Sequence, residues 1–220
     1  FGPDGFLYVT TGDAQEPSLA QDRNSLAGKI LRVTSDGDPA PGNPFGTRIY
    51  SYGHRNPQGI TWGRTERSEG DRLRAGARQR WELWETEHGS SATDELNLIT
   101  PGKNYGWPEI RGNQTRTGMV SPVMQSGSQT WAPAGTVFYL PAGRQGNGSI
   151  FFAGLRGSAL YEYKIIEQNL VEHFKGEHGR LRDVVVGPDN MLYVTTSNRD
   201  GRGNPRQGDD KILRVNPTKL

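Results

Sequence analysis

The sequence predicts an all-β fold, and three observations support this prediction. One phrase, a turn followed by a strand, occurs near both ends of the chain. The 220 residues include 30 glycines and 14 prolines, a composition typical of many short strands joined by turns. Outside an arginine-rich stretch at 64–80, no segment keeps the hydrophobic period of a helix for three turns.

The repeated phrase indicates how the strands are organised. The first copy, GPDGFLYVTTGD at Gly2–Asp13, is followed by GKILRV at Gly28–Val33. The second copy, GPDNMLYVTTSN at Gly187–Asn198, is followed by DKILRV at Asp210–Val215. Each copy predicts a turn, a strand of β-branched and aromatic residues, a polar loop and a second strand. Such repetition is typical of β-propellers, whose blades are four-stranded sheets.

Apolar and β-branched runs between loops rich in Gly, Pro, Asn and Asp predict twelve strands. They fall at 6–11, 29–34, 48–52, 58–62, 81–86, 95–99, 136–140, 149–153, 158–165, 182–186, 191–196 and 211–215. This length fits about four blades, which is the lower limit for a closed ring. We therefore expect residues 1–220 to form a single domain, part of a larger propeller whose N-terminal blades are missing.

Composition excludes several classes of protein. The hydrophobic fraction is 32%, and no apolar run reaches the ~20 residues of a membrane helix. Cysteine is absent, which excludes a disulfide framework and a thiolate metal site. The formal net charge is +2, with a cluster of arginines between Arg64 and Arg80. Without interleaved aromatic residues or a recognition helix, this cluster favours a solvated insertion over a nucleic-acid patch.

Two polar segments lie in the first half of the chain. In YGHRNPQG (Tyr52–Gly59), a His, an Arg and an Asn precede a proline that turns the chain. In ETEHGSSATDELN (Glu85–Asn97), Gly89 frees the backbone, and Asp94 and Glu95 offer the oxygen ligands that Ca²⁺ prefers. The alternatives are a solvated loop at a strand end and an acidic loop that caps a strand.

Two further segments, FFAGLRG (Phe151–Gly157) and GRLRDV (Gly179–Val184), carry arginines. Arg180 and Arg182 alternate along a predicted strand, so their side chains share one face. Two arginines on one face indicate an anion, such as a carboxylate or phosphate, because unpaired charge is costly to bury. A solvated strand face remains the alternative.

Taken together and in this order, the segments resemble the soluble glucose/sorbosone dehydrogenase family. The matching segments are FGPDGFLYVTTGDA, LAGKILRV, YGHRNPQG, ETEHG with DELN, NYGWP and RLRDVVVGPD, and they span nearly the whole chain. The resemblance implies a six-bladed β-propeller of four-stranded antiparallel blades that uses pyrroloquinoline quinone (PQQ) and Ca²⁺. The chain looks closer to the aldose sugar dehydrogenase branch than to the large soluble glucose dehydrogenases.

The resemblance also implies roles for single residues. Arg55 would be catalytic and would contact the quinone together with Asn56, while Asp13 would orient the catalytic base. The expected cofactor-binding residues further along the chain are Leu155, Arg156, Arg180 and Arg182. The expected Ca²⁺ ligands are Gly89, Ser90, Asp94, Glu95 and Tyr105, the first two through their carbonyl oxygens.

The implied reaction is oxidation of an aldose at its anomeric carbon. A base would take the hydroxyl proton while hydride passes to the quinone, and an external acceptor would then receive the electrons. Ca²⁺ and Arg55 would stabilise the charge that develops on the quinone oxygen. The family further implies a periplasmic or secreted protein that binds no nucleic acid and has no membrane span.

Three departures from the family pattern are visible. The base histidine of the family would lie upstream of Phe1, so we expect the isolated 220-residue chain to be inactive. Position 90 is Ser, where the family usually has Pro. The stretch from Arg64 to Arg80 is longer and more basic than the family's usual link.

Two other functions remain open at this stage. One is a non-catalytic propeller of the same fold that binds a protein or a sugar, although the presence of Arg55, Arg180 and Arg182 counts against it. The other is a metal-dependent lactonase, which the RNPQG and EHG segments fit poorly.

Overall fold

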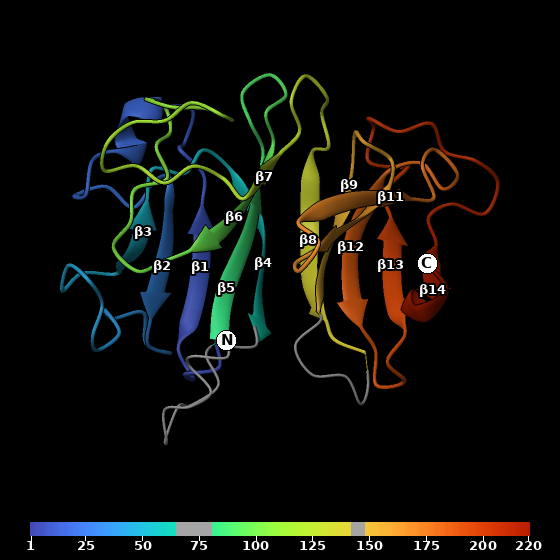
Figure 1. The fold of residues 1–220 in the computed structure, drawn as a ribbon, viewed down its shortest axis with the longest axis horizontal. Helices are drawn as coiled ribbons and strands as arrows, with labels where there is room; N and C mark the ends of the chain where they lie inside the picture. Colours follow the sequence, from blue (N-terminus) through green and yellow to red (C-terminus); the bar gives the residue numbers. More distant parts are fainter. Residues whose placement is uncertain (65–80, 142–147) are drawn as a thin grey trace. The chain divides into compact units, whose positions relative to one another are not determined.

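Regular structure in the computed structural model, which describes residues 1–64, 81–141 and 148–220, is almost entirely β-strand (Figure 1). In the first half lie β1 (Leu7–Thr11), β2 (Lys29–Val33), β3 (Ile49–Tyr52), β4 (Pro57–Arg64), β5 (Trp81–Glu87), β6 (Glu95–Ile99) and β7 (Met124–Gln125). They are followed by β8 (Pro133–Tyr139), β9 (Ser149–Gly154), β10 (Leu160–Lys164), β11 (Asn169–His173), β12 (Leu181–Val186), β13 (Leu192–Thr196) and β14 (Ile212–Val215). Two short 3₁₀ helices, η1 (Pro17–Ala20) and η2 (Pro217–Lys219), complete the described elements.

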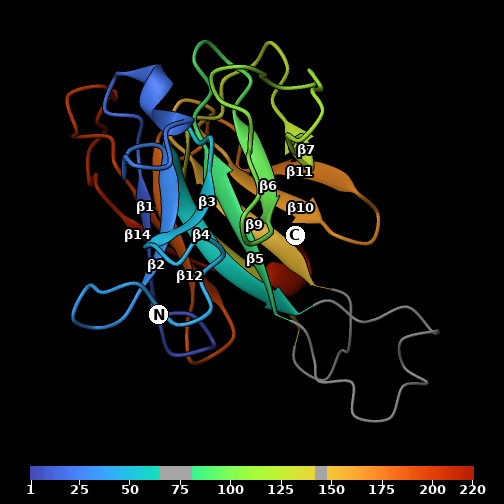
Figure 2. The ribbon, with the colours of Figure 1, turned by 90° about the vertical axis from the view of Figure 1, so that its left-hand side faces the viewer.

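The strands form four antiparallel sheets in which sequence neighbours are spatial neighbours. Their orders are β1-β2-β3, β4-β5-β6-β7, β11-β10-β9-β8 and β12-β13-β14. Both ribbon views show β4, β5 and β6 side by side (Figures 1 and 2). Antiparallel sheets of three or four strands that follow one another along the chain are the blades of a propeller, which confirms the predicted fold class.

Two strands, β7 and β11, are absent from the sequence prediction. β11 pairs with β10 across a tight turn, with Lys164 opposite Asn169 and Gln168 at a φ of 51°. It is a partly exposed edge strand of mixed polarity, so it lacks the apolar run on which the prediction relied. β7 has only two residues.

The chain divides into two compact units, and the boundary passes through β4 and β5. The first comprises residues 1–60 and 84–133, and its core includes Leu31, Val33 and Ile49. The second comprises residues 61–83 and 134–220. In this second unit β9 packs against β12, and Phe151, Leu181 and Val194 share one apolar core.

Two further sequence predictions concern the arginine-rich stretch and membrane-spanning segments. The arginine-rich stretch lies almost wholly in residues 65–80, outside the described residues. Among the residues that are described, no helix has the length and apolar character needed to cross a membrane.

Candidate active site

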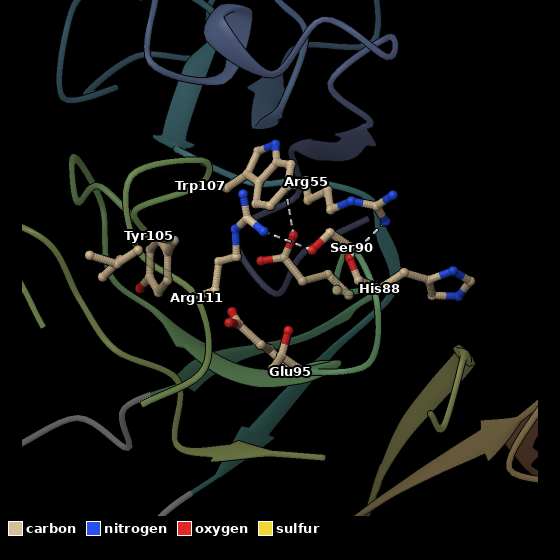
Figure 3. A pocket seen from close by; sticks show the side chains of 11 residues that line it. Arg55, His88, Ser90, Glu95, Tyr105, Trp107 and Arg111 are labelled. Atoms are coloured by element: carbon tan, nitrogen blue, oxygen red, sulfur yellow. Dashed lines mark hydrogen bonds between the residues drawn. The ribbon is translucent and has the colours of Figure 1, made fainter. Parts of the chain in front are cut away.

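Three loops of the first unit surround a pocket (Figure 3). The β3–β4 loop contributes Arg55, and the β5–β6 loop contributes His88, Gly89, Ser90 and Thr93. The β6–β7 loop contributes Tyr105, Trp107, Ile110 and Arg111. Five residues implicated by the sequence line this pocket: Arg55, Gly89, Ser90, Glu95 and Tyr105. The pocket is also lined by residues that the sequence did not single out, namely Glu87, His88, Thr93, Trp107, Ile110 and Arg111.

The buried carboxylate of Glu87, at the end of β5, fixes the backbone of the β3–β4 loop. Its Oε2 accepts hydrogen bonds from the backbone N–H of Arg55 at 2.7 Å and of Asn56 at 3.3 Å. Its Oε1 lies 3.3 Å from Nδ1 of the fully buried His54. Because one side chain satisfies three donors of a single loop, the position of Arg55 is set from β5.

Trp107 connects the catalytic candidates Arg55 and Asp13. The guanidinium carbon of Arg55 lies 5.5 Å from the indole ring centre, within cation–π range. The indole N–H donates to Asp13 Oδ2 at 2.9 Å, and the Asp13 amide donates to the Arg55 carbonyl at 2.8 Å. Figure 3 shows Arg111 beside the same ring. Its guanidinium carbon lies 5.0 Å from the ring centre. The structure therefore brings Asp13 next to the Arg55 loop, although it does not line the pocket.

Asp94 holds the loop that carries Gly89 and Ser90. Its Oδ1 accepts from the Gly89 N–H at 2.8 Å, and its Oδ2 accepts from the Trp131 and Ala132 amides at 2.6 and 2.8 Å. A Cβ at Gly89 would stand 2.0 Å from the Ala92 carbonyl oxygen, so the close turn requires glycine. Three backbone donors thus bind the buried Asp94 carboxylate, which fixes the β5–β6 loop.

Three carboxylates, which we call the acidic cluster, converge on one amide. The Asn97 side-chain nitrogen lies 3.1 Å from Glu85, 3.2 Å from Glu87 and 3.4 Å from Glu95. Burial, reinforced by the charge of Glu87, raises the pKa of Glu85 and raises that of Glu95 to about 8. Within the described part of the chain, Glu85 Oε1 and Asn97 Oδ1 have no hydrogen-bond partner. The cluster therefore has an excess of acceptor atoms, and burial opposes the ionisation of its carboxyl groups.

The remaining cofactor-binding candidates lie in the second unit. Leu155 is buried and Arg156 is exposed, directly after β9. Arg180 precedes β12 rather than lying in it, and a register shift between Leu181 and Asp183 marks a β-bulge. The bulge leaves Arg180 and Arg182 on the same side, where both approach Asp200. The Arg202 amide and the Arg180 guanidinium lower the pKa of Asp200.

Glu85, Glu87 and His54 are the main buried polar residues to which the sequence assigned no role. The two glutamates alternate in the strand segment ETE, which places both on one face of β5. That alternation was the available signal. His54 stands directly before Arg55, but its partners Ser51 and Glu87 could not be read from its position.

Comparison with known proteins identifies the family. The profile described as Glucose / Sorbosone dehydrogenase matches residues 1–204. The PQQ-bound aldose sugar dehydrogenase of Streptomyces coelicolor is 42% identical, with a TM-score of 0.81, over 97% of this chain and 59% of that chain. The aldose sugar dehydrogenase YliI of Escherichia coli is 30% identical over 99% of this chain and 58% of its own length. An uncharacterized Synechocystis protein is 32% identical over 91% of this chain and 52% of its own length.

The chain thus spans somewhat more than half the length of these relatives. The family profile covers nearly the whole of the present sequence, and the Streptomyces coelicolor enzyme also shares its fold. The chain belongs to the glucose/sorbosone dehydrogenase family.

Proposed function

We propose that the protein carrying this chain is a PQQ- and Ca²⁺-dependent dehydrogenase that oxidises aldose sugars at the anomeric carbon. The observation that carries the proposal is the pocket of the first unit, where Arg55 meets Gly89, Ser90, Glu95 and Tyr105. These residues are up to fifty positions apart in the sequence, yet the family resemblance assigns all of them to quinone or metal binding.

The donor set of the pocket fits a hard cation. Ca²⁺ takes about 6–8 oxygen ligands from carboxylates and carbonyls. The pocket offers the carboxylates of Glu87 and Glu95 beside the Gly89–Ser90 loop, whose turn is fixed by Asp94. A divalent cation would favour the ionised form of the acidic cluster, in which burial, followed by the charge of Glu87, raises the pKa of Glu95.

The arginines fit an anionic quinone. The guanidinium of Arg55 donates to the His88 carbonyl at 3.2 Å, and no ion pair of Arg55 is recorded among the described residues. Arg180 and Arg182 would hold carboxylates of the cofactor, and Leu155 and Arg156, directly after β9, would contribute further contacts. Asn56 would assist Arg55, since its backbone is fixed by the same glutamate.

The roles of the residues follow from these contacts. When bound, PQQ supplies the carbonyl carbon that accepts hydride from the sugar. Arg55 places a fixed positive charge on the pocket, held by Glu87 at its backbone and by Trp107 at its guanidinium. Asp13, which Trp107 holds in place, would orient the base that removes the proton of the anomeric hydroxyl. We further propose a periplasmic or secreted location and an external electron acceptor.

The test is turnover by the purified protein, expressed from its complete coding sequence. It is supplied with PQQ, Ca²⁺, a redox dye and a panel of aldoses. We expect dye reduction that needs both additions, and a loss of at least about a hundredfold in kcat/KM for Arg55→Ala. Arg48→Ala is the matched control, because Arg48 lies in the same unit and its side chain donates to the Gly37 carbonyl at the surface.

Two results would contradict the proposal. Wild-type protein that binds PQQ or sugar without turning it over would favour the non-catalytic binding propeller. Equal activity of Arg55→Ala and Arg48→Ala would remove the pocket from the reaction.

A further inference from the structure

Asp200, in the β13–β14 loop, contacts Arg180 and Arg182, two of the arginines of the second unit that are proposed to bind cofactor. Its Oδ2 accepts from Arg180 Nε at 3.0 Å and from Arg180 Nη2 at 2.8 Å. The same oxygen lies 3.5 Å from Arg182 Nη2. Its Oδ1 accepts from the Arg202 amide at 2.9 Å, which fixes the carboxylate itself. One carboxylate therefore joins two guanidinium groups that would otherwise repel each other.

The geometry of this contact leaves donors of Arg180 available. A guanidinium can bind a carboxylate through its side edge, Nε with one Nη, or through its end, Nη1 with Nη2. Asp200 occupies the side edge of Arg180 with a single oxygen. The end of Arg180 and most donors of Arg182 are not used by Asp200. A protein carboxylate that blocked the ligand site would instead bind the Nη1 and Nη2 ends of the two arginine side chains.

The aliphatic part and the backbone of Arg180 are also fixed by contacts. A Cβ on Gly203 would lie 2.9 Å from Arg180 Cδ, so the β13–β14 loop covers the side chain closely. The Arg180 amide donates to the side chain of the buried Asn198, and its carbonyl accepts from the Ser197 amide. Side-chain exposure falls to 14% for Arg180, against 45% for Arg182. The arrangement is that of a preorganised cation rather than a solvated one.

We propose that Asp200 is a positioning residue that makes Arg180 and Arg182 into one binding site for a carboxylate of the cofactor. The inference rests on the proposed function, because it takes PQQ as the anion. Asp200 does not touch the ligand in this arrangement. It binds Nε and Nη2 of Arg180, so that the Nη1 and Nη2 end of this guanidinium can donate two parallel N–H groups to the ligand. It also keeps the Arg182 guanidinium beside that of Arg180.

The experiment measures PQQ binding to the apoprotein with Ca²⁺ present, by quenching of tryptophan fluorescence. Asp200→Asn keeps the shape but removes the charge, and we expect Kd to rise about tenfold, the loss typical of a charge-assisted hydrogen bond. Asp200→Glu should restore part of the affinity. Asp189→Asn is the matched control, because Asp189 accepts from Arg214 Nε at 2.8 Å in the same sheet, and Asp200 rather than Asp189 is the partner of Arg180 and Arg182.

A second readout does not need the cofactor. The Nε–H of Arg180 should exchange slowly with solvent in the NMR spectrum of wild-type apoprotein and rapidly in Asp200→Asn. Loss of this protection together with unchanged PQQ affinity would overturn the inference, and so would tighter binding, which would make Asp200 a competitor of the cofactor. If wild-type protein binds no PQQ while the Nε–H is protected, the proposed function fails separately from the geometry.

Discussion

The two copies of the repeated phrase form the same pair of strands but surround it with different loops. In the first copy Leu7 pairs with Val33 and Val9 with Leu31; in the second, Leu192 pairs with Val215 and Val194 with Leu213. The loops at 12–28 and 197–211 differ in length, and their side chains contact different parts of the chain. The strands thus repeat a structure, whereas the loops carry what is particular to each copy.

The similarity extends to side chains at the turn. Asp4 Oδ2 accepts from the Tyr8 hydroxyl at 3.1 Å and from Arg32 Nε at 2.8 Å. In the second copy, Asp189 Oδ2 accepts from Tyr193 at 3.1 Å and from Arg214 at 2.8 Å. Each aspartate therefore joins the turn to both strands that follow it.

The difference is clearest at the lysine of the KILRV segment. Lys29 is fully buried, and its ammonium donates to the carbonyls of Leu19, Ala20 and Ala27 at 2.8, 3.1 and 2.5 Å. The equivalent Lys211 has a side chain that is 42% exposed and stands 3.8 Å from Asp209. The first loop folds back over its lysine, while the second extends toward Arg180.

Replacing the two lysines should therefore separate the copies most strongly. Lys29→Met would leave three carbonyls without their donor, and we expect a loss of about 3 kcal/mol in the free energy of unfolding. Lys211→Met should cost less than about 0.5 kcal/mol, as is usual for an exposed side chain. Urea unfolding of both variants measures the difference. Equal losses would mean that the ammonium–carbonyl contacts of Lys29 do not stabilise the loop.

The two copies should also differ, by a smaller amount, in how the free energy of unfolding depends on pH. Burial lowers the pKa of Lys29 to about 8, against 10.5 for an ordinary lysine. Between these values the unfolded chain binds more protons, so the contribution of Lys29 to the free energy of unfolding rises with pH. The slope is at most about 1.4 kcal/mol per pH unit.

Unfolding measured from pH 7.5 to 9.5 checks this expectation. Wild-type protein should show a steeper rise than Lys29→Met, while Lys211→Met should follow the wild type. A slope in Lys29→Met that matches the wild type would assign the titration to another group.

The turn aspartates should give the smallest effect. Asp4→Asn and Asp189→Asn each weaken the same contacts at partly exposed sites, so both should lower Tm slightly and by a similar amount. Differential scanning calorimetry of the two variants is the measurement. A large decrease of Tm in only one variant would show that the two aspartates contribute unequally to stability although their hydrogen bonds have equal lengths.

The same contrast explains what the sequence could predict. The strands that carry LYVTT and KILRV follow from periodicity and turn residues, because those signals are local. The pocket residues Arg55, Glu95 and Tyr105 came from family resemblance, and the structure brings them together. The contact between Trp107 and Asp13 joins residues 94 positions apart, and the Glu87 bonds to the Arg55 loop span about thirty. No local pattern encodes such pairs.

The bulge near Arg182 shows a subtler limit. Simple alternation placed Arg180 and Arg182 on one face of a strand, and they do share a side. The reason differs, because Arg180 lies outside β12 and the register shifts between Leu181 and Asp183. Alternation counts residues and cannot detect an extra one.

The identical register of the two strand pairs has a consequence for engineering. Loops of different length close the same pair of strands, and a longer closed loop costs only about 0.6 kcal/mol for each doubling of its length. The strand pair therefore accepts loops of different length, but a graft that replaces residues 12–28 must also replace Lys29, whose three carbonyl partners lie in that loop. A chimaera with the second loop grafted onto β1 and β2 would carry Asp200 to a new blade while the host ladder stays in register.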